Sequence, residues 1–399
     1  MNSDVVVVGG GIGGLATALG LSRAGATVTV LEQEPDFHEV GAGLELAPNG
    51  TRILRDWGLL DTMSALGVQP RTLVIKDAVT GAELTRMELD AEFEARYGAP
   101  YLVAHRSDLL TTLLDAVRAA GVTLVTSEHI DSVETEGPVA IATAASGNRY
   151  EASLVVAADG LSSTLRSELS PDAPIASGYV AYRGMVKTDE APIEADLDRV
   201  VLYIGPGCHF VQYPIRKAKD GVGALLNQVA VFQSPAFLRG EEEWGTPDEL
   251  DAAFSHCAPH IRHALGLVPR ERHWLMFDRE PIDEWVEGRL LLTGDAAHPM
   301  LQYLAQGACQ AIEDARVLQS IVSRMHVGHS DRWQEIAAEF TRARTERTAR
   351  VQRNARVWGE SWHVGGVART LRNLLFSERK QDDYRYTDWL YERGIIELT

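Results

Sequence analysis

The most constraining feature of this chain is a glycine cluster between two apolar runs near its N-terminus. Residues 5–8 are four consecutive valines, the pattern of a buried parallel strand, and the cluster at residues 9–14 follows directly. A helical apolar pattern comes next, and then a second strand-like run that ends at Glu32, 18 residues after Gly14. This order predicts a βαβ unit of the kind that binds a dinucleotide.

Each glycine of the G-x-G-x-x-G pattern has its own mechanical role. Gly9 allows the tight turn, Gly11 lets a pyrophosphate approach the backbone, and Gly14 lets the helix pack closely on the strand. The carboxylate of Glu32 can accept hydrogen bonds from a ribose 2′-OH and would repel a 2′-phosphate. The alternative is a glycine-rich turn that binds no nucleotide. The predicted cofactor-binding residues of this unit are Gly9, Gly11, Gly13, Gly14, Glu32 and Gln33.

Composition and charge narrow the class of protein. The chain has 399 residues, enough for two to three domains, and its formal net charge of −18 argues against a nucleic-acid partner and against an anionic membrane surface. The three cysteines show no paired spacing, which indicates a reducing compartment and no metal site. The chain shows neither a signal peptide nor a transmembrane stretch, so we expect a cytoplasmic protein. A homodimer is compatible with these features.

Residue patterns along the chain predict an α/β fold with a Rossmann-like domain and a second sheet. Strand-like alternation at residues 71–89 and through much of 175–285 predicts an inserted domain built on a mixed or antiparallel sheet. Helical patterns dominate after residue 307, and Ser107 or Asp108 is the predicted N-cap of an earlier helix. The expected divisions are 1–72, 100–174 and 286–350 for the nucleotide-binding domain, 73–99 and 175–285 for a substrate domain, and 351–399 for a C-terminal helical segment.

Two further polar motifs follow apolar, strand-like runs. Asp159-Gly160 ends one run, and Gly294-Asp295 ends another. Because ligands of doubly wound sheets bind at the carboxyl ends of the strands, we predict that these motifs join the glycine cluster in one site. Asp295 can accept a hydrogen bond from a ligand hydroxyl, and its alternative role is a helix N-cap. Gln306-Gly307, at the start of a predicted helix, can offer backbone N–H groups to an anion.

The three motifs together resemble the fingerprints of the class A flavoprotein aromatic hydroxylases, the group of para-hydroxybenzoate and salicylate hydroxylases. The segment 294–299, with Gln306-Gly307 and residues 311–314 behind it, is similar to their flavin segment, and the resemblance spans nearly the whole chain. It implies FAD as the cofactor, with Glu32 on the ribose and Asp295 on the ribityl chain or pyrophosphate. It also implies that Arg106 lies along the ribityl–pyrophosphate stretch and that Asp159-Gly160 serves both FAD and reduced nicotinamide.

Within this group the chain most resembles the bacterial 3-hydroxybenzoate 6-hydroxylases. Residues 205–214, which contain His209 and Tyr213, are similar to the substrate strand of that branch. Gln302 also matches the branch, whereas salicylate hydroxylase-like relatives usually carry proline there. Gln306 departs from it, since that branch is closer to serine at this position. The resemblance implies conversion of 3-hydroxybenzoate to 2,5-dihydroxybenzoate (gentisate) with NADH and O₂, through a flavin C4a-hydroperoxide.

This chemistry defines what the substrate residues must do. The transferred oxygen is electrophilic, so the ring must be made electron-rich by removing the phenolic proton. His209 is the predicted base, and a purely structural histidine is the alternative. Tyr213 lies on the same strand face and can hydrogen-bond the phenol or the carboxylate, while Gln302 can orient the ring over the flavin. His298 is expected to be structural, and the other histidines are assigned no role.

Three other functions stay open from the sequence. A salicylate or hydroxynicotinate hydroxylase of the same group would share all the cofactor motifs. An NAD-dependent dehydrogenase would share the glycine cluster but would not need Asp159-Gly160 or Gly294-Asp295. A nucleotide-binding module without enzymatic activity would not need so many polar groups at strand ends.

Overall fold

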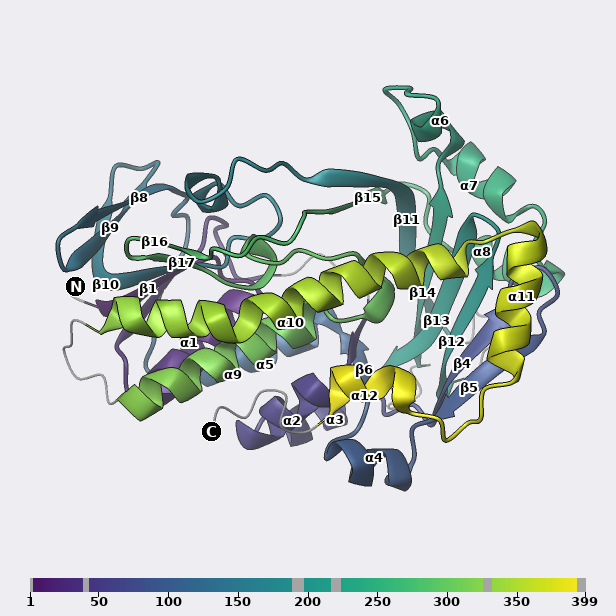
Figure 1. The fold of residues 1–399 in the computed structure, drawn as a ribbon, viewed down its shortest axis with the longest axis horizontal. Coiled ribbons are helices and arrows are strands. Elements are labelled where there is room, and N and C mark those ends of the chain that lie inside the picture. The colour runs from purple at the N-terminus through teal and green to yellow at the C-terminus, as the bar shows by residue number, and fades with distance from the viewer. Residues whose placement is uncertain (1–2, 39–42, 189–196, 217–223, 326–331, 393–399) are drawn as a thin grey trace.

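Two large sheets organise the computed structural model, which describes residues 3–38, 43–188, 197–216, 224–325 and 332–392 (Figure 1). The first sheet has eight strands in the order β16-β17-β10-β1-β2-β7, with β9 paired to β10 and β8 to β9. Its core strands β17, β10, β1, β2 and β7 run parallel. The bounds are β1 Ser3–Val8, β2 Val28–Leu31, β7 Thr123–Val125, β8 Ile130–Glu136, β9 Val139–Ala144, β10 Arg149–Ala157, β16 Val286–Glu287 and β17 Leu290–Leu292.

The second sheet has seven strands in the order β15-β11-β14-β13-β12-β4-β5. All its neighbours are antiparallel except β12 and β4, so the sheet is mixed, as the sequence predicts. The hairpin at 71–89 joins this sheet. The bounds are β4 Thr72–Asp77, β5 Glu83–Glu88, β11 Ile175–Lys187, β12 Arg199–Gly205, β13 Cys208–Arg216, β14 Leu225–Gln233 and β15 His273–Asp278. A small separate pair is formed by β3 Gly43–Leu46 and β6 Leu102–His105.

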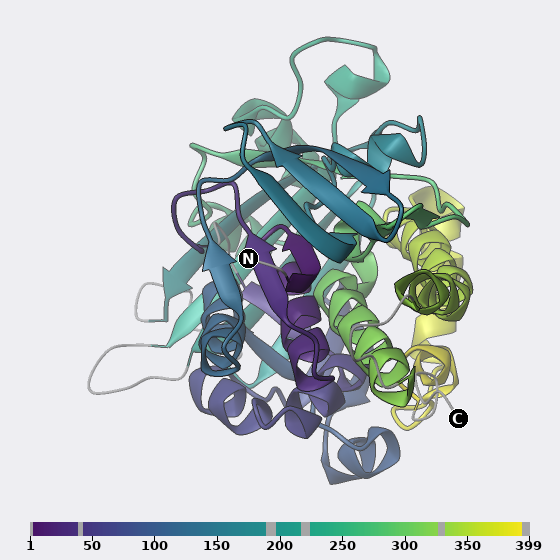
Figure 2. The same cartoon turned by 90° about the vertical axis from the view of Figure 1, so that its left-hand side faces the viewer.

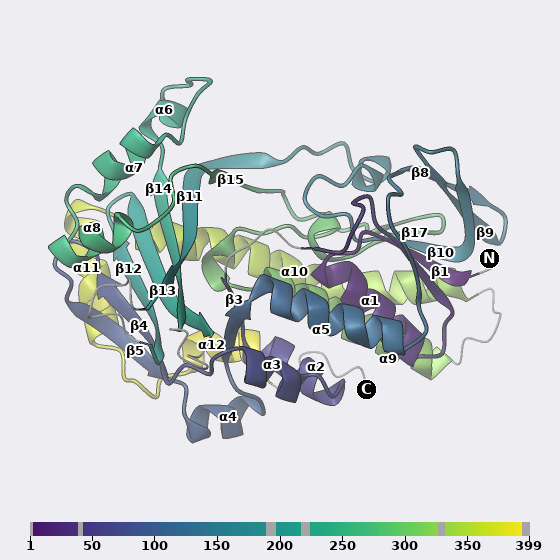
Figure 3. The ribbon, with the colours of Figure 1, turned by 180° about the vertical axis from the view of Figure 1, so that it is seen from behind.

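Helices cover the first sheet and connect it to the second. Figures 2 and 3 show α1, α5 and α9 on one face of the first sheet, with β8 and β9 on the other side. Helix α10 runs along the molecule from one sheet to the other (Figure 1). The α-helices are α1 Ile12–Arg23, α2 Pro48–Asp56, α3 Leu60–Leu66, α4 Ala91–Tyr97, α5 Arg106–Ala119, α6 Pro235–Leu238, α7 Pro247–Phe254, α8 Pro259–Leu265, α9 Gly307–Met325, α10 Trp333–Trp362, α11 Gly366–Ser377 and α12 Arg385–Tyr391. Three 3₁₀ turns are η1 Leu165–Glu168, η2 Gly294–Ala296 and η3 Gln302–Leu304.

The ends of α10 show how the two sheets are held together. Trp333 at its start is buried in the core of the first sheet, and Trp362 at its end is buried in a cluster against the second sheet. The expected boundary between residues 350 and 351 falls inside this continuous helix. The proposed division of the chain into domains therefore remains a prediction, although the C-terminal region is helical as expected. No helix of the described residues is both long enough and apolar enough to span a bilayer.

The glycine cluster adopts the geometry that its sequence predicts. Gly9 has φ +104°, and a Cβ there would lie 2.4 Å from the carbonyl oxygen of Ala158. A Cβ on Gly14 would lie 1.9 Å from the Gly9 carbonyl oxygen, so α1 can pack this closely only with glycine. A Cβ on Gly11 would meet no atom within 4 Å. The turn and the helix packing thus use Gly9 and Gly14, and the space at Gly11 is left for a ligand.

One helix start differs from its prediction. The N-cap of α5 is His105, whose Nδ1 accepts from the backbone N–H of Ser107 at 3.2 Å. Neither Ser107 nor Asp108 takes this position, because β6 ends at His105 and α5 begins at once. The carboxylate of Asp108 instead accepts from Arg216 at 2.7 Å.

Candidate active site

The three predicted cofactor motifs meet at one edge of the first sheet. Val8 at the end of β1 pairs with Ala157 at the end of β10, and Ala157 pairs with Leu292 at the end of β17. Val8 also pairs with Leu31 of β2, which precedes Glu32. Four parallel strands therefore finish at the same level, and their following residues converge where doubly wound sheets bind ligands.

The carboxylate of Glu32 is hydrogen-bonded to the backbone of the glycine cluster. Its Oε2 accepts from the Gly10 N–H at 2.6 Å, and its Oε1 accepts from the Glu34 N–H at 2.9 Å. Gln33 next to it is exposed, and its Oε1 lies 2.9 Å from Nδ1 of His129. Glu32 is thus fixed beside the open space at Gly11, in a position suited to a ribose.

The second motif contains a buried acceptor that lacks a partner. Oδ1 of Asp159 is buried and has no hydrogen bond to any residue that the structure describes. Burial raises the pKa of this carboxyl, and hydrogen bonds from the Ser163 side chain and the 164–165 backbone oppose the rise. Gly160 follows with φ +84° and open space around its α-carbon. A buried acceptor without a partner is costly, so this site fits a hydroxyl-bearing ligand such as FAD.

The third motif is fixed from behind by the buried carboxylate of Asp314. Its Oδ2 accepts from the Thr293 hydroxyl at 3.1 Å, the Gly294 N–H at 2.9 Å and His298 Nε2 at 2.6 Å. Its Oδ1 accepts from Arg344 Nε at 2.6 Å. Sequence reasoning placed His298 in a structural role and did not predict that Asp314 and Arg344 hold the loop.

The same loop places the side chain of Asp295 at the surface. The side chain of Asp295 is exposed, and one of its oxygens lies 4.0 Å from the Cβ position of Gly307. Thr293 precedes η2, so Asp295 is not its N-cap. Gly307 begins α9, as predicted, and Gln306 before it is buried, its Oε1 accepting from Asn49 and from Gln310 at 2.9 Å each. Asp295 and the N-terminus of α9 therefore border the same space.

The predicted base is enclosed by aromatic side chains. His209 on β13 is 1% exposed, and its Nδ1 lies 2.8 Å from Nε2 of His363, which follows α10. The rings of Tyr303 and Trp362 lie 5.6 and 5.1 Å from the imidazole. Burial, assisted by His363, lowers the pKa of His209 well below its ordinary value, so the imidazole is neutral at pH 7. No pattern in the sequence pointed to His363.

Tyr213 shares the sheet face of His209 but has different neighbours. It is 4% exposed, and a Cβ on Gly43 of β3 would lie 2.6 Å from its ring. Burial and the nearby Glu45 raise its pKa well above the ordinary value, so the phenol stays protonated and can donate a hydrogen bond. The charge of Arg106, the first residue of α5, also acts on Tyr213. The substrate strand and the predicted flavin arginine therefore lie within electrostatic range.

Gln302 has a partner that sequence reasoning did not identify. Its Oε1 accepts from the NH2 group of Arg183 on β11 at 2.7 Å. Gln302 belongs to η3, in the loop that leads from the third cofactor motif into α9. The contact joins the cofactor loop to the second sheet. His209, Tyr213 and Arg183 thus lie on one face of the second sheet, and Gln302 contacts this face through Arg183.

Two of the three cysteines, Cys208 and Cys257, lie close together in space. Sγ of Cys208 lies 3.7 Å from Sγ of Cys257, and a nitrogen of His256 comes within 4.8 Å of both. The expected absence of a metal site stays a prediction.

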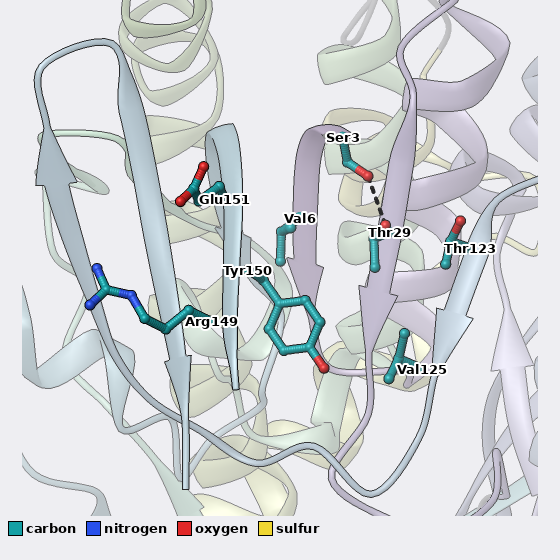
Figure 4. A pocket seen from close by; sticks show the side chains of 8 residues that line it. All are labelled: Ser3, Val6, Thr29, Thr123, Val125, Arg149, Tyr150 and Glu151. Atoms are coloured by element: carbon teal, nitrogen blue, oxygen red, sulfur yellow. Dashed lines mark hydrogen bonds between the residues drawn. The ribbon is translucent and has the colours of Figure 1, made fainter. Parts of the chain in front are cut away.

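A separate pocket on the first sheet is not part of the candidate active site. Figure 4 shows it over the beginnings of the strands, lined by residues such as Ser3, Thr29, Thr123 and Tyr150. The cofactor motifs follow the opposite ends of these strands.

Comparisons with known proteins show the family of the chain. The profile of the family described as "FAD binding domain" matches residues 2–355. The chain is 36% identical over 392 residues to 3-hydroxybenzoate 6-hydroxylase of Klebsiella oxytoca, covering 97% of this chain and 96% of that enzyme. It is 35% identical over 398 residues to 3-amino-4-hydroxybenzoate 2-monooxygenase of Streptomyces cremeus, covering 98% and 95%.

Solved structures share the fold. HpxO of Klebsiella pneumoniae, complexed with FAD and uric acid, gives a TM-score of 0.84 at 24% identity, covering 98% of this chain and 97% of that one. A salicylate hydroxylase–substrate complex gives 0.79 at 23% identity, covering 97% and 94%.

The chain belongs to the family of FAD-binding flavoprotein monooxygenases that includes the aromatic hydroxylases. It is a flavin-dependent monooxygenase, similar along its full length to the 3-hydroxybenzoate 6-hydroxylases. The predicted fold class, cofactor FAD and enzyme class are confirmed, and the dehydrogenase and non-enzymatic readings are set aside.

The two buried histidines predict a pH-dependent stability. Burial, assisted by Arg372, lowers the pKa of His363 to about 3 from 6.5. The folded protein then binds fewer protons than the unfolded chain between these values. The contribution of His363 to the free energy of unfolding is complete above pH 6.5. It decreases as the pH falls, by about 2 kcal/mol at pH 5.

Urea unfolding of the holoenzyme at pH 8 and pH 5 measures this effect. We expect His363→Gln to reduce the stability difference between the two pH values by about 2 kcal/mol. Asp314, whose pKa is lowered, loses its contribution only at lower pH, so it does not obscure the comparison. An unchanged difference would contradict the buried neutral state of His363.

Proposed function

We propose that the enzyme hydroxylates 3-hydroxybenzoate at C6, giving 2,5-dihydroxybenzoate with NADH and O₂ as co-substrates. The observation that carries this proposal is the placement of His209 and Tyr213 on one face of β13, with Gln302 on the cofactor loop beside that face. The relatives that the chain resembles over its full length act on hydroxybenzoates by name. A cytoplasmic location is part of the proposal, because the reaction consumes NADH.

For the proposed reaction, the residues of the cofactor site fit FAD. Glu32 would hold the ribose, Asp159 and Asp295 would accept from hydroxyl groups, and the backbone at Gly11 leaves space for the pyrophosphate. Bound FAD, once reduced by NADH, supplies an electrophilic oxygen atom derived from O₂. The chain itself must therefore activate the ring, orient it and exclude water.

Activation requires removal of the phenolic proton. In the tautomer with a proton on Nδ1, His209 donates to Nε2 of His363, and its own Nε2 keeps a lone pair. The lowered pKa keeps His209 in this neutral, accepting form at pH 7. When Nε2 takes the phenolic proton, the resulting imidazolium remains hydrogen-bonded to His363. The electron density released into the ring is largest ortho and para to the phenolic oxygen, and C6 is para.

Tyr213 and Gln302 would orient the substrate ring. The protonated phenol of Tyr213 can donate to a substrate oxygen, since its pKa is raised by burial. Gln302 is held through its Oε1 by Arg183, so its amide has a fixed direction. Surrounding side chains such as Tyr303 and Trp362 are buried and keep water away from His209.

A substrate panel tests the proposal. We expect 3-hydroxybenzoate to stimulate NADH oxidation most strongly, with 2,5-dihydroxybenzoate as the product by chromatography and a higher kcat/KM for NADH than for NADPH. The panel includes salicylate, 6-hydroxynicotinate and 3-amino-4-hydroxybenzoate. Salicylate consumed with release of CO₂ would assign the enzyme to the neighbouring branch, and 3,4-dihydroxybenzoate as the main product would contradict the orientation given by Gln302.

A further inference from the structure

We propose that Arg183 binds the carboxylate of the aromatic substrate. Strand β11 would then carry the residue that selects aromatic acids over neutral phenols. This inference rests on the proposed function and names a recognition residue for it. Arg183 lies within the strand run that the sequence predicts, but no motif singled it out.

The strand register places Arg183 on the face that carries the predicted base. Arg183 on β11 pairs with Val229 on β14, and Val229 pairs with Val211 on β13. Directly paired residues point to the same side of a sheet, and Val211 lies between His209 and Tyr213 on their face. Arg183 is two strands from Val211, a backbone separation of roughly 10 Å. An aromatic ring can therefore extend from β13 to β11 across the two valines.

The guanidinium of Arg183 has no counter-charge in the described part of the chain. It donates a hydrogen bond to the neutral Oε1 of Gln302 at 2.7 Å, and its buried Nε has no partner among the described residues. No carboxylate of a described residue lies within ion-pair distance of it. Burial lowers the pKa of Arg183, and the charge of Arg106 adds to this effect. Arg183 is half-buried, and a partly desolvated cation with a buried, unpaired N–H group is destabilising, so a ligand that brings an anion would complete the site.

The groups around Arg183 favour an aromatic carboxylate. The Nε–NH2 edge of a guanidinium matches the two oxygens of a carboxylate, and here its Nε is unused. The guanidinium also lies over the ring of Trp274, 5.5 Å from its centre. Val211 and Val229 supply apolar surface for the substrate ring between the two polar ends.

Anchoring at both ends would fix which carbon reacts. In 3-hydroxybenzoate the phenol and the carboxylate are meta to each other, and C6 is the ring position para to the phenol and next to the carboxyl carbon. A ring held at its phenol by His209 and at its carboxylate by Arg183 cannot rotate in its own plane. Gln302 then acts as a positioning residue, because its Oε1 is bonded to the same guanidinium.

Ligand titration of the FAD-loaded enzyme tests this role. The flavin absorbance change gives the Kd of 3-hydroxybenzoate and of the neutral 3-hydroxybenzamide, for wild type, Arg183→Gln and Arg183→Lys. We expect Arg183→Gln to weaken the benzoate about 10- to 100-fold and the amide less than about threefold. Arg183→Lys keeps the positive charge but loses the paired N–H groups of the guanidinium. Its affinity for the benzoate should therefore lie between those of wild type and Arg183→Gln.

A matched control comes from the same tryptophan. Arg272 also lies over the Trp274 ring, at 5.1 Å, but it is exposed. Arg272→Gln should leave both Kd values unchanged. Flavin content is measured for every variant, since Arg183→Gln should retain FAD.

The outcomes separate this inference from the proposed function. Equal weakening of benzoate and amide, or no weakening, would overturn the role of Arg183 while leaving the reaction in place. If wild type binds other aromatic acids but not 3-hydroxybenzoate, and Arg183→Gln abolishes that binding, the carboxylate site stands and the proposed substrate fails. If wild type binds no aromatic acid, the inference is wrong.

Discussion

Replacing Asp314 with alanine is expected to lower the free energy of unfolding by about 3–5 kcal/mol and to release FAD. Asp314 is 0% exposed and binds the Gly294 N–H, His298 and Arg344 at once. Burial alone would raise its pKa, but the charges of His298 and Arg344 hold the pKa below its ordinary value. Its removal leaves the guanidinium of Arg344 without one of its partners in a dry site. The loop that presents Asp295 would lose its support.

A surface ion pair between the same two helices provides the control for this prediction. Arg324 on α9 and Glu339 on α10 form an exposed pair. Because exposed pairs contribute little, Glu339→Ala should cost less than about 1 kcal/mol. Urea unfolding and flavin retention after gel filtration measure both variants. A loss below 1 kcal/mol with FAD fully retained in Asp314→Ala would show that the loop does not depend on this carboxylate.

The second large effect is expected from His209→Gln. Removal of a general base typically slows the chemical step about 10²–10⁴-fold, so hydroxylation should fall by that factor. Reduction of FAD by NADH should persist, because His209 is placed against the substrate face and not at the cofactor motifs. Reducing equivalents that no longer reach the ring should appear as H₂O₂.

Stopped-flow flavin reduction, product yield and H₂O₂ release measure this variant in one experiment. Two further variants calibrate it. His273 on β15 is exposed, so His273→Gln should leave all three quantities unchanged. His363→Gln should have a smaller effect than His209→Gln, since a glutamine oxygen can still accept from Nδ1. Full product yield in His209→Gln would assign the histidine a structural role.

The parts of the fold that depend on nearby residues could be predicted from the sequence. Gly9, Gly14 and Glu32 act within a single βαβ unit, and the steric contacts of the two glycines agree with their predicted roles. The start of α9 at Gly307 follows from its local pattern in the same way. The convergence of the three motifs could also be predicted from the sequence, because buried parallel strands end at a common edge of the sheet.

The contacts of the candidate active site could not be predicted, because they join distant segments. His209 and His363 are 154 residues apart, and Arg183 and Gln302 are 119 apart. A buried histidine after a long helix, or an arginine within a strand, carries no spacing signal. The exposure of Asp295 also depends on tertiary structure, since the preceding strand is buried and only the 3₁₀ turn brings the side chain outward.

The most direct test of the central claim is a single turnover with isotopically labelled oxygen. The FAD-loaded enzyme is reduced with NADH in the absence of oxygen and then mixed with 3-hydroxybenzoate and ¹⁸O₂. We predict 2,5-dihydroxybenzoate that carries one ¹⁸O in the new hydroxyl group, para to the original phenol. Reoxidation of the flavin with unchanged 3-hydroxybenzoate and stoichiometric H₂O₂ would contradict the proposed reaction.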